Sequence, residues 1–342
     1  IQSFADQPLE GFTYGSVNAP TGKEWESPEN LALNKEQPHA YFFPFQHLDN
    51  ARKVLPENSK YWQSLDGDWK FHWAPDPDSR PKDFYQTEYD VSSWDAIPVP
   101  SSWNIYGIQK DGSQKYGTPI YVNQPVIFQH SVKVDDWRGG VMRTPPANWT
   151  TYKDRNEVGS FRRDFEIPQD WDGREVFISF DGVDSFFYLW INGQYVGFSK
   201  NSRNTANFNI TPYLQKGKNT VAAEVYRSSD GSFLEAQDMF RLPGIFRTVA
   251  LYSVPKVHFR DLVATPDLDV TYTDGSLTVN AEIRNLDKKA IKDYKVYYSL
   301  YANKLYSDEN TLVDGFLSPV IDKIAPNETG SVQTVLKVKA PN

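Results

Sequence analysis

Two apolar stretches separated by an Asn-Gly pair constrain the fold of this chain more than any other feature. Residues 186–191 read Phe-Phe-Tyr-Leu-Trp-Ile, and residues 194–198 read Gln-Tyr-Val-Gly-Phe. Asn192 and Gly193 stand between them, and both residue types tolerate the positive φ that a tight two-residue turn requires. The sequence therefore predicts an antiparallel β-hairpin at this point.

The same pattern of short strands and turn residues extends over most of the chain. Residues 64–73 alternate apolar and polar side chains, residues 175–180 form an apolar run that ends at Asp181-Gly182, and residues 219–227 form another run. We find no amphipathic helical stripe of useful length, so the pattern predicts an all-β protein. Many short strands with frequent turns favour a jelly-roll β-sandwich over residues 56–255.

A second series of strands follows Val254-Pro255, which we interpret as a domain boundary. The series includes residues 257–263, 276–283, 294–301 and 331–338, and Asp274-Gly275 is expected to supply a turn. A stretch of about 85 residues with this pattern suits an immunoglobulin-like β-sandwich, which we place at residues 256–342. Residues 1–55 are irregular but carry Trp, Tyr and Phe, and they predict an ordered N-terminal arm.

The composition excludes several classes of function. Lys and Arg number 36 against 44 Asp and Glu, which gives a net charge of −8. Nucleic acid is not an expected partner, because its binding depends on basic side chains that neutralise phosphates. The chain has no cysteine, which excludes disulfides, thiolate catalysis and cysteine-ligated zinc. No stretch approaches the roughly 20 apolar residues of a membrane span, so membrane insertion is not expected.

The high aromatic content has two interpretations. Phe, Trp and Tyr make up 15% of the chain. Aromatic faces stack on sugar rings, so this content fits a carbohydrate-binding protein. Large β-sandwiches also place many aromatic residues in their strands, so composition alone leaves both interpretations open.

The run from Gly231 to Arg247 has no regular period. It crowds acidic, amide, aromatic, methionine and arginine side chains into a short stretch that contains glycine near each end. It neither alternates like a strand nor repeats like a helix, so we expect a structured loop between strands. Loops with such a composition tend to carry function.

An ordered series of motifs runs through the chain: Glu24-Trp25-Glu26-Ser27-Pro28, Leu65-Asp66-Gly67-Asp68-Trp69, Leu189-Trp190-Ile191-Asn192-Gly193 and Gln237-Asp238-Met239 within the run above. Together these motifs resemble the β-galactosidases of glycoside hydrolase family two. The resemblance covers nearly the whole chain. It implies the N-terminal sugar-binding jelly-roll domain and the first immunoglobulin-like domain of such an enzyme.

The resemblance also implies two site residues. Asp238 matches the family aspartate that ligates a sodium ion and contacts the galactose hydroxyls, and Asn123 matches the asparagine that hydrogen-bonds galactose. Without the resemblance, Asp238 fits a loop carboxylate paired with Arg241 or Arg247, and Asn123 fits an ordinary turn residue. We expect Glu235 and the two arginines to pair within the run and hold Asp238 in place. Magnesium is implied for the intact enzyme.

The family's catalytic barrel, with both of its carboxylates, follows the immunoglobulin-like domain. We therefore expect no catalytic residue in this chain, and whether the last strand of that domain is included stays open. Asn156-Glu157 and Asn327-Glu328, the two Asn-Glu pairs, are rejected as the family's acid/base site because both stand in polar segments. The chain alone is expected to be inactive on β-galactosides and to bind galactose weakly, because half a pocket lacks most contacts.

Other interpretations are a free-standing carbohydrate-binding module that uses Trp103, Trp149 or Trp171, a ligand-free scaffold, or another family-two glycosidase such as a β-glucuronidase or β-mannosidase. The Asp238 motif with Asn123 favours the galactosidase. The expected partners are galactose or a β-galactoside, a downstream catalytic barrel of the same protein, and further copies in a homo-oligomer. The chain begins at Ile1, which we interpret as a periplasmic or secreted bacterial protein without its signal peptide, with a cytoplasmic location as the alternative.

Overall fold

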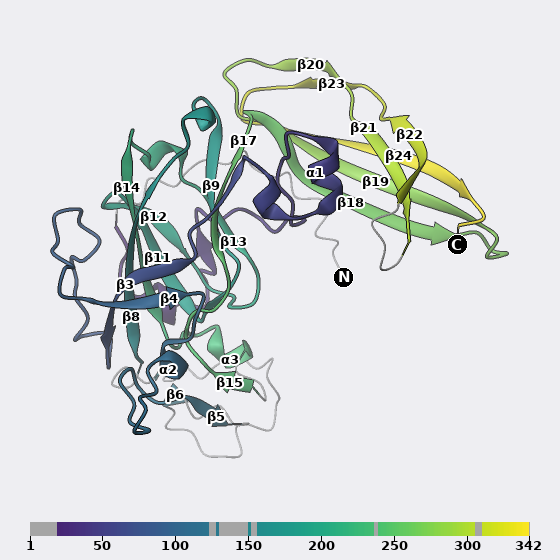
Figure 1. Cartoon of the computed structure of the whole chain (residues 1–342). Helices are drawn as coiled ribbons and strands as arrows, with labels where there is room; N and C mark the ends of the chain where they lie inside the picture. The colour runs from purple at the N-terminus through teal and green to yellow at the C-terminus, as the bar shows by residue number, and fades with distance from the viewer. Residues whose placement is uncertain are drawn as a thin grey trace. The chain divides into compact units, whose positions relative to one another are not determined.

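The computed structural model describes residues 19–122, 128–129, 150–151, 156–235, 239–304 and 310–341. Strands dominate its regular structure (Figure 1), which confirms the all-β prediction. The longest helix in the described ranges, α1 (Leu48–Lys53), has six residues, and none of the helices there is long and apolar enough to cross a membrane. The chain divides into a larger unit, residues 19–37 and 43–253, and a smaller unit, residues 38–42 and 254–341.

The elements of the larger unit are mostly short strands. In chain order they are β1 (Ala32–Leu33), α1, β2 (Trp62–Ser64), β3 (Gly67–Ala74), β4 (Asp95–Val99), α2 (Trp103–Tyr106), β5 (Ile120–Val122), β6 (Phe128–Gln129), β7 (Thr150–Thr151), β8 (Val158–Glu166), β9 (Glu175–Phe180), β10 (Val183–Asp184), β11 (Phe186–Ile191), β12 (Gln194–Ser199), β13 (Ala206–Asn209), β14 (Lys218–Tyr226), α3 (Ser232–Glu235), β15 (Met239–Arg241), β16 (Gly244–Ile245) and β17 (Val249–Val254).

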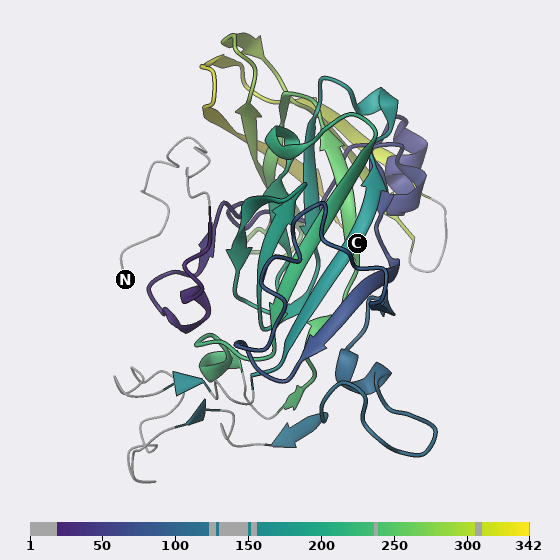
Figure 2. The ribbon, with the colours of Figure 1, turned by 90° about the vertical axis from the view of Figure 1, so that its left-hand side faces the viewer.

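Two antiparallel sheets form the sandwich of the larger unit (Figure 2). A seven-stranded sheet has the order β1-β12-β11-β14-β8-β3-β4, and a four-stranded sheet has the order β13-β9-β17-β2. Aromatic side chains from both sheets meet between them. The ring of Phe187 on β11 lies 4.8 Å from that of Phe180 on β9 and 6.0 Å from that of Phe208 on β13. This contact joins the sheets through one continuous apolar core.

The outer face of the seven-stranded sheet is also covered. Trp25 from the predicted arm stacks on Tyr226 with ring centroids 5.3 Å apart, and Tyr85 stacks on Trp190 at 4.9 Å. As a result every residue of β11 is buried. Burial on both faces explains why this strand is apolar throughout, where a half-buried strand would alternate.

The predicted hairpin is confirmed. β11 and β12 pair antiparallel around Asn192 and Gly193, whose φ values are 51° and 76°. The Asn192 side chain is used as well: its Nδ2 donates to the Tyr213 carbonyl at 2.9 Å, and its Oδ1 accepts from the Thr220 amide at 2.8 Å. The turn is therefore tied to two neighbouring segments as well as to its own strands.

The smaller unit is a second, thinner β-structure. Its strands are β18 (Val257–Leu268), β19 (Asp274–Asn285), β20 (Ile291–Tyr294), β21 (Tyr297–Asn303), β22 (Asn310–Leu317), β23 (Ile321–Ile324) and β24 (Thr329–Lys339). β18, β19 and β24 form one antiparallel sheet, while β20 pairs with β23 and β21 with β22. Its buried core cluster contains Ala281, Ile283, Val296, Ile321, Ile324 and Val332.

The turn predicted at Asp274-Gly275 is wrong. Both residues belong to β19, and they pair with Lys339 and Val338 of β24. The chain reverses just before them, where the Asp269 carboxylate accepts hydrogen bonds from the amides of Thr271 and Thr273. An aspartate that hydrogen-bonds backbone two residues ahead makes a turn without glycine, and this signal outweighs the Asp-Gly pair.

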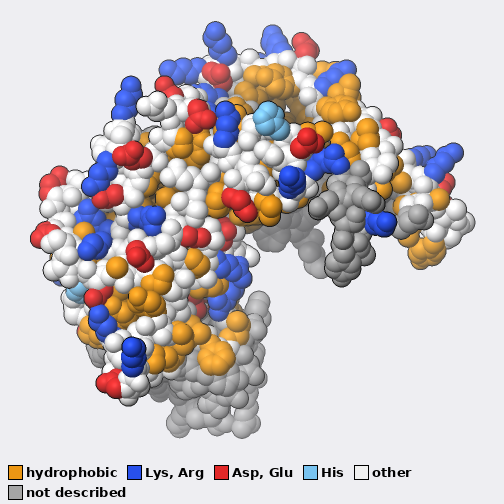
Figure 3. Space-filling view, viewed as in Figure 1, with side chains coloured by type: hydrophobic (Ala, Val, Ile, Leu, Met, Phe, Trp, Pro, Cys, Tyr) orange, Lys and Arg blue, Asp and Glu red, His pale blue; other side chains and the backbone are white. Residues whose placement is uncertain are grey.

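The surface mixes both signs of charge. On the face shown in Figure 3, Lys and Arg side chains lie among Asp and Glu side chains over both units. Hydrophobic side chains are scattered between them on that face.

Candidate functional site

The two site residues expected from the resemblance, Asn123 and Asp238, lie outside the described residues. Their neighbours in the sequence lie within them. β5 and β15 pair antiparallel, and Val122 is the partner of Met239. Since Asn123 directly follows Val122 and Asp238 directly precedes Met239, the described flanks of both candidates meet at one end of a short ladder.

The run expected to be one structured loop contains three short elements. α3 begins it, β15 pairs with β5, and β16 pairs with β10. Gly244 has a φ of 140°, and a Cβ atom there would lie 2.5 Å from the Ser101 carbonyl oxygen. A strand of two or three residues is too short to show an alternation of apolar and polar side chains. The strands that pair with β15 and β16 are also far away in the sequence. The loop prediction was therefore wrong in its description of the secondary structure.

Glu235, the last residue of α3, is held from outside the run. Its Oε1 accepts a hydrogen bond from the Ser202 amide at 2.9 Å, and its Oε2 accepts one from the Ser202 hydroxyl at 2.5 Å. Arg247 donates to the carbonyls of Arg203 and Asp181 at 2.8 and 3.3 Å. The expected pairing within the run is thus wrong for these two side chains, which bind segments that follow β9 and β12.

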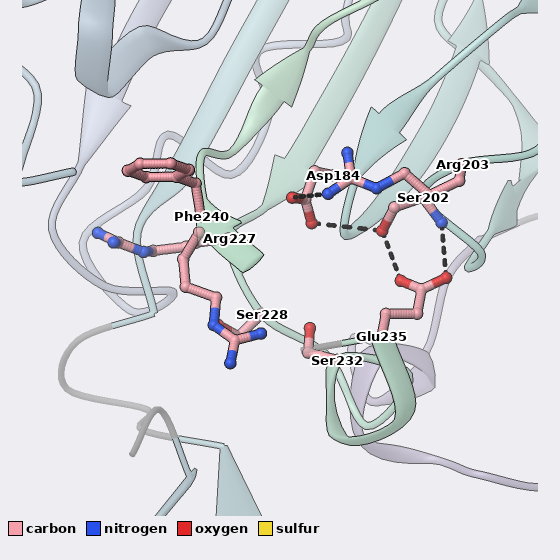
Figure 4. Close-up of a pocket in the computed structure, with 9 residues that line it drawn as sticks. Asp184, Ser202, Arg203, Arg227, Ser228, Ser232, Glu235 and Phe240 are labelled. Carbon is pink, nitrogen blue, oxygen red and sulfur yellow. Dashed lines mark hydrogen bonds and ion pairs between the residues drawn. The ribbon is translucent and has the colours of Figure 1, made fainter. Parts of the chain in front are cut away.

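Asp184 on β10 joins the same group of contacts. Its Oδ1 lies 3.3 Å from the Ser202 hydroxyl oxygen, and its Oδ2 lies 3.6 Å from Nη2 of Arg203. Burial disfavours the charged form of the carboxyl and raises the pKa of Asp184 to about 6, although Arg203 opposes the shift. We call Asp184, Ser202, Arg203 and Glu235 the Ser202 cluster (Figure 4).

A small polar cavity adjoins the Ser202 cluster. The cavity has a volume of about 20 Å³ and is lined by Asp184, Ser202, Arg203, Arg227, Ser228, Ser232, Glu235, Phe240 and Arg241. This space suits about one water molecule and is too small for a sugar ring. The residues that line this cavity therefore do not enclose a sugar themselves, and their contacts suit the support of a neighbouring site.

A second buried network holds the segment that precedes β5. Glu157 accepts hydrogen bonds from Arg227 at 2.5 Å, from the indole of Trp103 at 2.9 Å and from Asn104 at 3.0 Å. Arg227 also donates to the Thr118 carbonyl at 3.0 Å. Residue 157 lies in a loop just before β8, as predicted, but its side chain is buried. Three donors occupy its carboxylate, which fixes the approach to β5.

The binding-module interpretation requires exposed tryptophans that can stack on a sugar, and two of its three candidates are buried. Trp103 and Trp171 are 0% and 1% exposed, and Trp149 lies outside the described residues. Trp171 donates to the Lys60 carbonyl at 2.9 Å, while Trp103 serves the Glu157 network. Their apolar faces pack in the core, so neither can stack on a sugar.

Sequence comparison identifies relatives with a shared name. Residues 62–255 match the family model described as "Glycosyl hydrolases family 2, sugar binding domain". The chain is 41% identical over 279 residues to the beta-galactosidase of Priestia megaterium, covering 81% of this chain and 25% of the relative. It is 34% identical over 295 residues to the beta-galactosidase large subunit of Lactobacillus helveticus, covering 82% and 43%. The chain thus spans less than half of each relative.

Solved structures share the fold. A Bacteroides uniformis beta-glucuronidase 2 superposes with a TM-score of 0.58 at 19% identity, covering 82% of this chain and 28% of that one. A beta-glycosidase from Bacteroides vulgatus gives a TM-score of 0.52 at 23% identity, covering 82% and 29%. The family model accounts for more than half of the sequence. The chain therefore belongs to glycosyl hydrolases family 2, and its residues 62–255 are the sugar-binding domain of that family.

Proposed function

We propose that this chain is the N-terminal, non-catalytic portion of a β-galactosidase that hydrolyses terminal β-D-galactosides with retention of configuration. The carboxylates that attack and protonate the glycosidic bond belong to a catalytic barrel outside the chain, and this portion shapes the galactose pocket. Relatives named beta-galactosidase support the proposal at 33–41% identity. A homo-oligomeric assembly and a periplasmic or secreted location, with a cytoplasmic alternative, stay predictions.

The pairing of β5 with β15 is the observation that carries this proposal. It brings Val122 and Met239, the sequence neighbours of Asn123 and Asp238, together. Hydrogen bonds hold the segments that precede both strands. Arg227 of the Glu157 network binds Thr118 before β5, and Ser202 binds Glu235 before β15. Polar groups recognise a ligand best when their supports are rigid, because less ordering entropy is lost on binding.

The neighbouring activities receive less support. The solved structures named beta-glucuronidase share only 15–20% of their sequence with this chain, a level that supports the fold alone. The binding-module alternative loses Trp103 and Trp171, both of which are buried. The Gln237-Asp238-Met239 motif together with Asn123 favours a galactoside.

Sodium at Asp238 and magnesium elsewhere in the longer enzyme are part of the proposal. A carboxylate is a suitable ligand because hard cations prefer oxygen. Within the described ranges no group of three or more His, Cys, Asp or Glu side chains could hold a metal ion. The sodium proposal therefore depends on Asp238 and the residues around it.

The test is a chimera in which this chain replaces the matching 279 residues of the Priestia megaterium enzyme. It is assayed on aryl β-galactosides, β-glucuronides and β-mannosides. We expect the chimera to hydrolyse the galactoside and the chain alone to do nothing above blank. Asp238→Asn in the chimera should lower kcat/KM about a hundredfold, because a charged hydrogen-bond acceptor to the sugar is lost.

Asp172→Asn is the matched control, since Asp172 is an exposed carboxylate of the same unit. It should change kcat/KM by less than about twofold. Three outcomes would overturn the proposal: turnover by the chain alone, a folded chimera that is silent on galactosides, or an Asp238→Asn chimera as active as its parent.

A further inference from the structure

Ser202 lies between two carboxyl groups. Its hydroxyl oxygen is 2.5 Å from Glu235 Oε2 and 3.3 Å from Asp184 Oδ1. Figure 4 shows both carboxyl groups directed at this one residue from different segments. A serine hydroxyl has a single hydrogen, so Ser202 can donate to only one of the two carboxyl groups at a time.

The geometry assigns that hydrogen to Glu235. Glu235 receives the hydroxyl and the amide of Ser202 on its two oxygens, which is the use of an ionised carboxylate as a double acceptor. Asp184 then faces a lone pair of the Ser202 oxygen. A hydrogen bond at this position requires Asp184 to donate, and a carboxyl group can donate only when it is protonated.

The charged groups around Asp184 act in both directions. Arg203, from the segment after β12, lies 3.6 Å away and favours the ionised form, as does Arg241 of β15. Glu235 of α3 and burial favour the protonated form, and burial has the largest effect on the pKa of Asp184. Arg227 lines the same cavity but is paired with Glu157. The proton is therefore retained to about pH 6.

The contacts of the Ser202 cluster reach the described chain on both sides of Asp238, at α3 before it and at β16 after it. Glu235 is the last residue of α3, three positions before Asp238. Asp184 pairs with Gly244 of β16, three positions after Arg241. If Asp184 loses its proton, its negative charge faces that of Glu235 on the other side of the Ser202 hydroxyl. The hydrogen bond between Asp184 and Ser202 is then lost.

We propose that Asp184 is a positioning residue that carries a proton and, through Ser202 and Glu235, holds the segment that leads into Asp238. The cluster makes the order of this segment depend on pH. The effect of this pH dependence on sugar binding rests on the function proposed above. The effect on the order of the segment itself does not depend on that function.

The first test is hydrogen exchange of the full chain, read at the amides of residues 232–235 and 239–241 and corrected for the intrinsic effect of pH on exchange. The opening equilibrium of these amides should rise about tenfold between about pH 5 and about pH 8, because the closed form loses its proton on Asp184. Asp184→Asn is always neutral, and its amide can donate to Ser202. This variant should show no such rise.

Asp164→Asn is the matched control. This aspartate of β8 binds Thr220 and Lys218 and is not part of the Ser202 cluster. The control should follow the wild-type profile. A wild-type profile that is flat with pH, or an Asp184→Asn profile that follows wild type, would overturn the proposal.

The wild-type protein supplies a second measurement that needs no variant. With aspartate labelled at its carboxyl carbon, the Asp184 resonance should titrate near pH 6, and a titration midpoint below about 4, near the ordinary aspartate value, would contradict the proposal. In the chimera, KM for the galactoside should rise with pH in wild type but not in Asp184→Asn, with kcat similar in both. A silent chimera would count against the proposed function and leave the exchange result valid.

Discussion

The larger and smaller units bury their strands differently. In the larger unit both faces of the seven-stranded sheet are covered, one by the four-stranded sheet and the other by Trp25 and the segment around Tyr85. In the smaller unit the core cluster has six buried residues, and large apolar side chains such as Tyr297 and Val335 are 64% and 56% exposed. Since stability follows buried apolar area, we expect the larger unit to resist unfolding more strongly.

The largest effect should come from the core of the larger unit. Trp103 is fully buried, lies 6.0 Å from the Phe71 ring and donates to Glu157. Trp103→Ala should lower the free energy of unfolding by about 4 kcal/mol, because it leaves a large cavity and removes one of the two hydrogen bonds that Glu157 Oε2 accepts. Urea unfolding followed by tryptophan fluorescence measures this unit alone, since all ten tryptophans precede residue 254. A decrease in the free energy of unfolding of less than about 1 kcal/mol would contradict the conclusion that the buried core makes the larger unit more resistant to unfolding.

The cover on the outer sheet face should be the next most sensitive feature. Arg162 Nη1 donates to the carbonyls of Phe84, Gln86 and Tyr89 at 3.1, 3.0 and 2.9 Å. Arg162→Met should cost about 3 kcal/mol in the same urea experiment, because three carbonyls, of which that of Phe84 is in a buried contact, lose their common donor. Arg163→Met, the neighbouring and more exposed position on β8, should cost no more than about 0.5 kcal/mol. Equal effects would mean that this cover adds little stability.

The smallest effect should come from the smaller unit. Ile283 is 5% exposed in its core, and Ile283→Val should destabilise this unit by about 1 kcal/mol. Hydrogen exchange at β18 and β19 measures the loss, while the tryptophan transition should not move. Val335→Thr, at an exposed position of the same sheet, should stay within about 0.5 kcal/mol. A shift of the tryptophan signal by Ile283→Val would show that the two units unfold together.

The sequence predicted the strands and the hairpin well, because alternation, apolar runs and Asn-Gly pairs are local signals. β9, β11 and β12 lie where those signals placed them. Burial of β11 on both faces was not predictable, since its second cover comes from Trp25 and Tyr85, far away in the chain. The Asp274-Gly275 turn failed because the Asp269 side chain forms the reversal earlier.

The candidate site was less predictable from the residues alone. Asn123 and Asp238 came from the family resemblance, and they stay predictions. The contacts of Glu235 with Ser202, and of Glu157 with Arg227, join positions 33 and 70 residues apart. No local period marks such pairs. Glu157 does lie in a loop, but its burial was not predictable because the donors to its carboxylate are distant in the sequence.

The strand order of the larger unit has a consequence for synthesis. β2 pairs with β17, and β3 pairs with β8, so some of the earliest strands must wait for some of the latest. During translation β2 has no strand partner until β17 has left the ribosome, and β3, which can pair early with β4, waits for β8 on its other edge. Pairing over such separations is slow and leaves apolar surface open to aggregation. Expression yield should therefore respond to temperature and chaperone supply more than the stability of the finished protein would suggest.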